Sequence, residues 1–418
     1  MIRLLDKSKI SLYNYFYIFC MFIYAGNATR FARGLGEIFT IGNTFAMCIT
    51  IGFFVVNRIK LKRPYHISIL VFLLYAIVTS INNRWISPNW ILEWLIWLTL
   101  AYGICQGFKE KLFVTVETVL YHLCVIALAF WVVYLISPCF IIRLVKTYEF
   151  SQPYAEECNV FANMIVYTVG NPDDTYGADF WLFTRNAGFA WEPGAFSCFA
   201  CLGLFCNILR TNFKLRNRSL WVFLVSLLSS QSTTGFFVFL VMVMLWLILK
   251  KKYLALLILL PLGIMIFNLP FVKMKFLFEF NNLQDSDVNE LSGSLGRLYS
   301  FQLNMEEFLR HPIIGLGGYT GGTWLAKQGY DVALISGIGD MLVYFGAVMT
   351  LLFIRLLVKS CKYIQQVIMT KNSWLLIVVI IGMMISYNLW KQPIFIAFWM
   401  FGYYASESDK PKKGYLPA

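Results

Sequence analysis

The sequence predicts an all-α polytopic membrane protein with about twelve transmembrane helices and two long outer loops that contain short helices. Of its 418 residues, 59% are hydrophobic and only 14% are charged, whereas soluble domains carry about 25% charged residues. Many separate apolar segments approach the roughly 20 residues that cross a bilayer. A single soluble core stops growing at about 250–300 residues and could not bury them all. We therefore treat residues 1–418 as a single integral membrane domain.

The apolar segments predict the positions of the spans. The expected helices cover residues 11–27, 36–57, 66–82, 89–106, 113–136, 194–210, 219–232, 236–250, 253–269, 335–357, 374–390 and 392–406. If the N-terminus is cytoplasmic, the inner segments hold 23 of the 35 Lys and Arg residues. Basic residues in short loops mark the cytoplasmic side, so both termini are expected in the cytoplasm. The first helix is expected to be retained, because its removal would invert this pattern.

Two long segments, 137–193 and 270–334, interrupt the up-and-down pattern and fall on the outer side. Unstructured connections longer than about 15 residues are usually functional or disordered, and aromatic residues in both loops argue against disorder. In the second loop, apolar residues spaced by three and four before Pro312 predict a helix that begins near Arg297. Cys139 and Cys158 both lie in the first loop, where a disulfide is expected if that loop faces an oxidising compartment.

The stretch RNAGFAWEPGAF at residues 185–196 stands directly before a predicted span. Pro193 suits the first position of a helix, because its missing amide proton would be unpaired there. Glu192 then falls at the N-cap, where the positive end of the helix favours a carboxylate. A role in starting the helix therefore explains these two residues without any part in a reaction. It does not explain Arg185, which we take as a candidate site residue.

Other polar residues gather at the predicted outer face. Asp340 lies about five residues inside its span, where a lone charge costs on the order of 2.5–3.5 kcal/mol, so it requires a basic partner or water. Each of the others has an alternative role as a helix cap or an interfacial anchor. They are Ser232 and Thr233 in SSQSTTG, Tyr319 in GLGGYTGG, Arg310 at the end of the loop helix, and Lys391 between the last two spans.

The sequence predicts neither a metal site nor a cofactor. Its three histidines, His66, His122 and His311, are far apart and have no nearby pair of carboxylates. GLGGYTGG lacks the lysine and the spacing of a nucleotide-binding loop. Within the spans, His122 is expected to be packed and hydrogen-bonded. Glu117 is expected to face the cytoplasmic loops.

Arginines at an outer membrane face suit an anionic ligand carried by a lipid. The planar guanidinium binds phosphate oxygens through two hydrogen bonds and stays charged at physiological pH. Two or three such groups could hold a diphosphate and stabilise it as a leaving group, which is a role that metal ions take elsewhere. Glu192 and His311 are the candidates for a base that accepts a proton from an attacking hydroxyl.

Two stretches resemble the signatures of O-antigen and capsular polysaccharide polymerases, which are related to O-antigen ligases. RNAGFAWEPGAF is similar to the family's R-x-x-G-x-x-x-E-P-G stretch through Arg185, Gly188, Glu192, Pro193 and Gly194. GRLYSFQLNMEEFLRHPIIGLG resembles the second signature through Gly296, Arg297, His311, Pro312, Gly315 and Gly317. QSTTG and SGIGDMLVYFG also look like segments of that family. The first 180 residues match only in hydropathy.

The resemblance implies a metal-independent glycosyltransferase with a GT-C-like fold in the bacterial inner membrane. It would polymerise oligosaccharide repeat units linked to undecaprenyl diphosphate on the periplasmic face, and the expected partners are lipid-linked donor and acceptor glycans, membrane lipid and a chain-length regulator protein, with no nucleic acid. The predicted catalytic residues are Arg185, Glu192, Arg297 and His311. The predicted substrate-binding residues are Arg310, Ser232, Thr233, Asp340, Lys391 and Tyr319.

Three alternative functions compete with the polymerase. One is a structural or assembly partner in a polysaccharide complex, which would tolerate Arg185→Ala. O-antigen ligases, which transfer glycan to lipid A core, usually carry a His-Asn-like motif after the second loop's Pro-Gly region, and this chain has no histidine after His311. A lipid-linked oligosaccharide flippase or transporter would suit twelve spans equally well. The long loops and the outer position of Arg185, Arg297 and Arg310 favour a transferase over a transporter.

Overall fold

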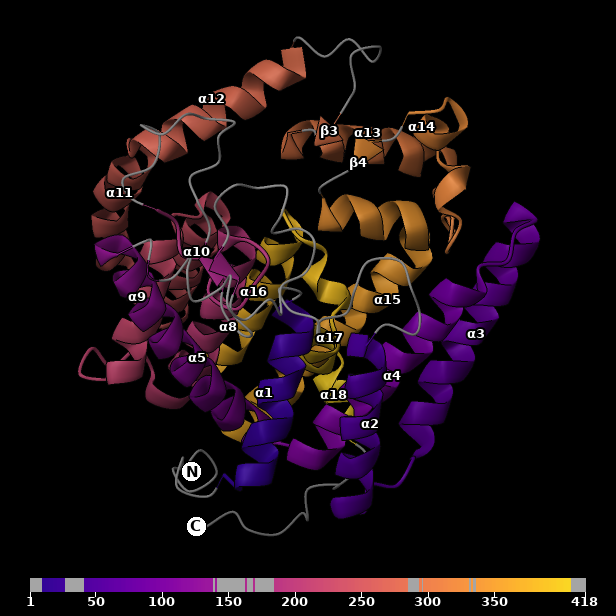
Figure 1. Cartoon of the computed structure of the whole chain (residues 1–418), viewed down its shortest axis with the longest axis horizontal. Coiled ribbons are helices and arrows are strands. Elements are labelled where there is room, and N and C mark those ends of the chain that lie inside the picture. Colours follow the sequence, from indigo (N-terminus) through magenta and orange to yellow (C-terminus); the bar gives the residue numbers. More distant parts are fainter. Residues whose placement is uncertain are drawn as a thin grey trace.

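The computed structural model describes residues 10–26, 41–137, 140, 162–163, 168–169, 184–284, 293–294, 296–330, 332–333 and 336–406. The termini and the predicted Cys139–Cys158 disulfide lie outside these residues. Nearly all of the described chain is helical (Figure 1). The α-helices before the second long loop are α1 (Leu12–Gly26), α2 (Ile41–Val56), α3 (Arg63–Asn83), α4 (Pro88–Phe108), α5 (Lys111–Ile136), α8 (Pro193–Thr211), α9 (Arg218–Ser230), α10 (Thr233–Leu249) and α11 (Tyr253–Phe267).

The second long loop contains three α-helices, and the last part of the chain returns to the bundle. The α-helices of this half are α12 (Pro270–Gln284), α13 (Arg297–Arg310), α14 (Trp324–Lys327), α15 (Gly337–Ile368), α16 (Leu375–Met384), α17 (Pro393–Trp399) and α18 (Phe401–Tyr404). Short 3-10 helices are η6 (Thr320–Gly322), η7 (Lys371–Trp374) and η8 (Asn388–Lys391). Two-residue strands pair as β1 (Ala162–Asn163) with β2 (Thr168–Val169), antiparallel, and β3 (Gly293–Ser294) with β4 (Val332–Ala333), parallel.

The helices fit a polytopic membrane protein. Among the described residues, five helices are long and apolar enough to cross a membrane, namely α3, α4, α5, α8 and α15. Five further apolar stretches are shorter, namely α1, α2, α9, α10 and the stretch from η7 through α16. Every predicted span overlaps one of the observed helices. The number of twelve crossings stays a prediction.

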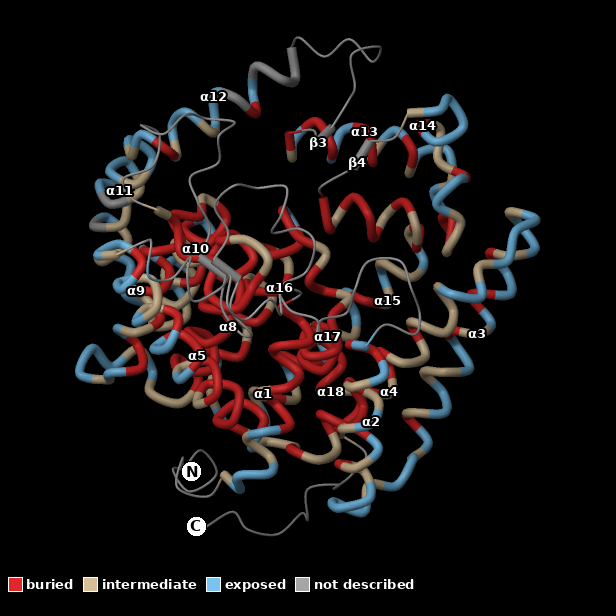
Figure 2. Tube along the Cα trace, in the orientation of Figure 1, coloured by how far each residue is buried: buried red, intermediate tan, exposed pale blue. Residues whose placement is uncertain are grey.

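Helix α8 forms the centre of the bundle, where the buried part of the chain is concentrated (Figure 2). All of its residues from Pro193 to Leu209 are buried. Small side chains allow its neighbours to approach closely: a Cβ at Gly203 would collide with the ring of Phe223 on α9. A helix that is apolar all round belongs in the interior of a bundle. The packing around α8 therefore fixes the positions of both of its ends.

The tenth predicted span, 335–357, differs from the structure in length and continuity. Helix α15 runs to Ile368 but is interrupted at Gly346, whose φ of 62° and ψ of −175° are not helical. The segment after Pro312 fills the break, because Leu316 N donates to Val343 O at 2.9 Å and Ala347 N donates to Pro312 O at 2.8 Å. The interrupted backbone is thereby hydrogen-bonded, as a buried backbone requires.

The eleventh predicted span, 374–390, is also shorter in the structure. Helix α16 ends at Met384, and the chain then passes through Tyr387 into η8. The polar residues between Ser386 and Lys391 contact other side chains rather than extending the helix. We call residues 386–391 the connecting segment.

Helices α12 and α13 lie beyond one end of the bundle, transverse to α1, α4 and α5 (Figure 1). The predicted loop helix is confirmed as α13, whereas the sequence did not predict α12. Glu279 joins the two helices, because its carboxylate accepts a hydrogen bond from Leu298 N in the first turn of α13 at 3.0 Å. An acidic side chain at this position satisfies an otherwise unpaired donor and complements the helix dipole.

Candidate functional site

The loop before α8 holds Arg185 against the end of α9. Arg185 is 9% exposed, and its Nε donates to the carbonyl oxygen of Ser230 at 3.1 Å. Asn186 beside it donates through its backbone nitrogen to Ser229 O at 3.0 Å and accepts a hydrogen bond from Gly188 N. Gly188 has a φ of +57° and lies against the ring of Phe196, so only glycine fits this turn. Arg185 is therefore fixed in place by a backbone carbonyl.

Arg297 begins α13 and is held by two side chains from other parts of the chain. Its Nη1 donates to Thr234 Oγ1 at 3.2 Å, and its Nη2 donates to Tyr387 Oη at 2.9 Å. The guanidinium carbon also lies 5.1 Å from the centre of the Tyr387 ring. Burial lowers the pKa of Arg297, but Tyr387, Glu192 and Glu279 more than compensate and raise it above its ordinary value. Arg297 is therefore a permanent positive charge.

Glu192 occupies the N-cap position of α8 but does not cap it. Its backbone is extended, with φ −152° and ψ 158°, and its side chain makes no capping hydrogen bond. The carboxylate instead interacts with the hydroxyl of Tyr387. Gly194 makes this contact possible, since any side chain there would collide with Tyr387 Oη. The predicted N-cap position of Glu192 and the helix start at Pro193 are thus confirmed, but the side chain makes no capping hydrogen bond.

Lys275 on α12 adds a third cation, which sequence reasoning missed. Lys275 and Glu279 are four residues apart and so share one face of α12, the face that Glu279 turns toward the start of α13. Lys275 is half-buried, and its pKa is lowered well below its ordinary value by burial and by the charges of Arg297 and Arg185. We call Arg185, Glu192, Lys275, Glu279 and Arg297 the cationic cluster; it brings together three basic and two acidic side chains.

The far end of α13 carries a separate group of residues. His311 follows the last residue of α13, and its Nε2 lies 3.9 Å from Glu307 Oε1. Arg310 is exposed and stacks on Trp324, with its guanidinium carbon 5.3 Å from the ring centre. A straight helix of 14 residues is about 20 Å long. Arg310 and His311 are therefore not part of the cationic cluster.

Asp340 has the basic partner that the sequence predicted. Lys391 Nζ lies 3.1 Å from Asp340 Oδ2, and Asn388 Nδ2 donates to the same oxygen at 2.6 Å. Two residues proposed from separate spans, Asp340 and Lys391, are thus brought together. The Lys391 ammonium also lies 5.8 Å from the centre of the Tyr344 ring.

The connecting segment 386–391 links these features. Ser386 Oγ is 2.6 Å from Thr234 Oγ1, which accepts from Arg297. Tyr387 contacts Arg297, and Lys391 pairs with Asp340. Sequence patterns did not identify Tyr387, which lies in a stretch that is predicted to be the end of an apolar span.

Three predicted substrate-binding residues have other surroundings. Ser232 caps α10, because its hydroxyl accepts a hydrogen bond from Gly235 N at 3.2 Å. Its neighbour Thr234, rather than the half-buried Thr233, contacts Arg297. The ring of Tyr319 stacks on Trp85 with centres 5.3 Å apart. The Ser/Thr-rich turn therefore reaches the cluster through a residue that the sequence did not single out.

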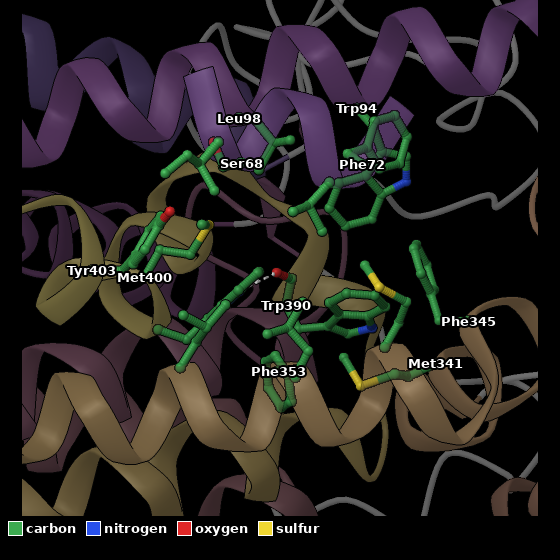
Figure 3. A pocket seen from close by; sticks show the side chains of 16 residues that line it. Ser68, Phe72, Trp94, Leu98, Met341, Phe345, Phe353, Trp390, Met400 and Tyr403 are labelled. Carbon is green, nitrogen blue, oxygen red and sulfur yellow. Dashed lines mark hydrogen bonds between the residues drawn. The ribbon is translucent and has the colours of Figure 1, made fainter. Parts of the chain in front are cut away.

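An apolar cavity of about 200 Å³ lies between α3, α4, α15 and the last helices (Figure 3). Its wall includes Phe72, Trp94, Phe345, Phe353 and Trp390. Met341 and Phe345 line it directly beside Asp340 and Tyr344, which line a second, polar cavity of about 420 Å³. The two cavities share α15 as a common wall.

The described residues contain no group of three or more His, Cys, Asp or Glu side chains that could hold a metal ion. No model of a known protein family matches the chain. No curated protein matches it either.

Proposed function

We propose that this protein is a glycosyltransferase of the bacterial inner membrane that polymerises lipid-linked oligosaccharide repeat units on the periplasmic face. The observation that carries the proposal is the cationic cluster, which joins both signature stretches. Arg185 and Glu192 come from the first stretch and Arg297 from the second, and Tyr387 bridges Glu192 and Arg297. Such a cluster, with its excess of positive charge, fits a diphosphate.

The reaction would exchange one bond at the anomeric carbon of the donor glycan. An acceptor sugar hydroxyl attacks this carbon, the bond from the carbon to the diphosphate oxygen breaks, and the lipid diphosphate leaves with the electron pair. Arg297 and Lys275, with Arg185 behind them, stabilise the negative charge that develops on the leaving group. Preorganised donors of this kind are a large source of rate enhancement, and they would allow transfer without a metal ion.

Glu192 is the better candidate for the base that takes the hydroxyl proton. It is half-buried within the cationic cluster and lies beside Tyr387. His311, the other candidate from the sequence, is at the opposite end of α13 from Arg297. A base must lie within hydrogen-bonding reach of the proton that it accepts, so Glu192 and Arg297 form the proposed catalytic pair.

The apolar cavity in Figure 3 supports a lipid-borne substrate. Its lining is almost entirely apolar, and Trp390 in that lining belongs to the connecting segment that also holds Tyr387. A prenyl chain could therefore occupy the groove while its diphosphate reaches the outer face. Burial of an isoprenoid would be favourable by about 25 cal/mol for each Å² of apolar surface removed from water.

The experiment supplies the purified protein with undecaprenyl-diphosphate-linked repeat units in the presence of a chelator. We expect long glycan chains to form. Removal of one electrostatic stabiliser typically costs about 10²–10³ in rate, and we expect such a loss for Arg297→Gln. Arg297→Lys should recover only part of it, because lysine keeps the charge and loses the planar pair of donors.

Matched controls and acceptors separate the alternatives. Arg216→Gln, in the α8–α9 turn, removes a basic residue far from the cluster and should leave activity unchanged. Product that forms only on lipid A core would instead identify a ligase. Transport of the lipid-linked unit without any chain growth, in a protein whose melting temperature is normal, would identify a flippase.

A further inference from the structure

A polar cavity lies beside the C-terminal half of α13. Its volume is about 420 Å³, within the usual range of about 300–1,000 Å³ for small-molecule sites. Three elements enclose it: the C-terminal half of α13, the segment from Thr320 to Tyr330, and the start of α15. Neither Arg185, Glu192 nor Arg297 lines it.

The charge of this cavity is opposite to that of the cationic cluster. Its lining holds the carboxylates of Glu306, Glu307 and Asp340 against the single guanidinium of Arg310. Lys391 pairs with Asp340 and lies 5.8 Å from the centre of the Tyr344 ring, so the remaining carboxylates, Glu306 and Glu307, outnumber Arg310 in the lining. A phosphate or a uronic acid would meet this excess of negative charge at close range, so the lining favours a neutral or cationic ligand.

Hydrogen-bonding groups in the cavity are incompletely used by the protein. Asn304 is 2% exposed, and its Nδ2 has no hydrogen-bond partner among the described residues. Asp340 accepts its two hydrogen bonds on Oδ2 alone. Asn304 Nδ2 is packed against Gly339 and out of reach of a ligand, whereas Asp340 Oδ1 accepts no hydrogen bond from the described residues and could accept one from a sugar hydroxyl.

Aromatic walls complete the recognition surface. Trp324 and Tyr344 both line the cavity, and Arg310 holds one side of the Trp324 ring. Trp324 is further fixed by its backbone nitrogen, which donates to Glu307 Oε2 at 2.6 Å. Aromatic faces beside a few fixed polar groups suit sugar rings, which present an apolar face and a rim of hydroxyl groups.

We propose that this cavity binds neutral or amino sugars of the substrate glycan at a distance of several sugars from its diphosphate. The inference rests on the proposed function for the identity of that glycan. Along α13, the cavity wall begins at Leu303, about 9 Å from Arg297, and extends to Arg310, about 20 Å from Arg297. One lipid-linked oligosaccharide would therefore place its phosphates at Arg297 and a later sugar beside Trp324. The site then selects the repeat unit by composition and charge.

The test measures binding of three lipid-free tetrasaccharides to the full-length protein in detergent by tryptophan fluorescence and saturation-transfer NMR. The probes are the neutral N-acetylglucosamine tetramer, its cationic deacetylated form, and the anionic galacturonate tetramer. We expect the first two to bind and the third to fail. Trp324→Leu should weaken binding about tenfold, which is the scale of one lost stacking contact.

Reversing the charge of Glu306 tests whether the negative charge of the cavity excludes anionic sugars. Glu306 is exposed and contacts only Gln302 among the described residues, so Glu306→Lys should fold normally and admit the anionic tetramer. Glu110→Lys, in the α4–α5 turn, makes the same charge change elsewhere and should not. Binding that is absent for all three probes, or unchanged by Trp324→Leu and Glu306→Lys, would overturn the inference.

Arg297→Gln distinguishes this inference from the proposed function. We expect it to slow polymerisation by about 10²–10³ and to leave tetrasaccharide binding within about twofold, because no residue of the cationic cluster lines the cavity. Tetrasaccharide binding in a protein that never polymerises would refute the proposed function and leave the sugar site standing. Loss of tetrasaccharide binding in Arg297→Gln would refute the separate site.

Discussion

The two ends of α8 carry buried charges of different kinds. At one end Arg210 donates to both oxygens of Glu117 at 2.6 Å, and Asn207 donates to the same carboxylate at 2.9 Å. At the other end Glu192 belongs to the cationic cluster. In the first arrangement the carboxylate is paired and hydrogen-bonded, whereas the second contains three basic side chains and two carboxylates.

The difference distinguishes a structural ion pair from a candidate site. A buried charge is tolerated when its partner and its hydrogen bonds are all present, and Glu117 meets this condition with 0% of its side chain exposed. It does not face the cytoplasmic loops, as the sequence had suggested. Buried ionisable groups with perturbed pKa values are typical of functional sites, and Lys275 and Arg297 of the cationic cluster are of this type.

The largest expected effect on stability comes from breaking the ion pair between Arg210 and Glu117. Loss of one partner of a buried ion pair typically costs about 3–5 kcal/mol, and we expect Arg210→Met to lower stability by this amount. Glu117→Gln should cost less, because the Arg210 side chain is 22% exposed and can reach solvent. Thermal melting in detergent measures both. If Arg210→Met melted like the wild type, the pair would not be structural and the comparison would fail.

Gly194 tests the packing that places Glu192 against Tyr387. A methyl group there would collide with Tyr387 Oη, and such overpacking typically costs about 1–3 kcal/mol. We therefore expect Gly194→Ala to lower both the melting temperature and the rate of polymerisation. Tyr387→Phe in the same protein should recover stability without recovering activity. Gly263→Ala on α11, where the nearest atom is 3.8 Å from the added carbon, is the tolerated control.

Substitution of Lys275 tests how burial of its charge affects the stability of the protein at different pH values. Its pKa in the folded protein lies below the ordinary 10.5, so the unfolded chain binds this proton more tightly and protonation favours unfolding. We expect Lys275→Met to raise the melting temperature by a few degrees at neutral pH while it reduces polymerisation. The gain should shrink as the pH approaches 10.5, where the unfolded lysine also loses its proton.

Lys273→Met provides the control for this experiment, because Lys273 is exposed on the same helix. It should change neither stability nor its pH dependence. A Lys275→Met protein that melts below the wild type at neutral pH would show that the lysine is matched, and the contrast with Glu117 would disappear.

The smallest expected effect separates two neighbours in the Ser/Thr-rich turn. Ser232→Ala removes an N-cap and should cost about 1 kcal/mol with polymerisation unchanged. Thr234→Val should also cost about 1 kcal/mol, because the buried hydroxyl contacts Ser386 and Arg297, but unlike Ser232→Ala it should slow polymerisation, because Thr234 holds Arg297. Equal effects of the two variants on the rate would assign the turn a purely structural role.

Much of the fold could be predicted from hydropathy, because each span is a continuous stretch of sequence. The start of α8 at Pro193 and the helix α13 followed from local signals of this kind. The interruption at Gly346 could not be predicted in this way, since its hydrogen-bond partners come from Pro312 and its neighbours. The end of α16 at Met384 depends in the same way on contacts from Thr234, Arg297 and Asp340.

The residues of the candidate site also divide into those that the sequence identified and those that only the structure identified. Arg185, Glu192 and Arg297 stood out because charged or polar residues are rare in so apolar a chain, and Asp340 stood out because its charge demanded a partner. Lys275 and Tyr387 gave no comparable signal, and Arg310 and His311 were grouped with Arg297 only because they are near it in sequence.

The amino-acid sequence by itself determined that this chain forms apolar helices with polar segments gathered between them, because the cost of exposing or burying each stretch depends on its own composition. Only the tertiary structure decided which charges meet. Whether a carboxylate caps a helix, pairs with an arginine or faces an excess of cations depends on side chains that arrive from distant segments, and their distances are fixed by packing around α8.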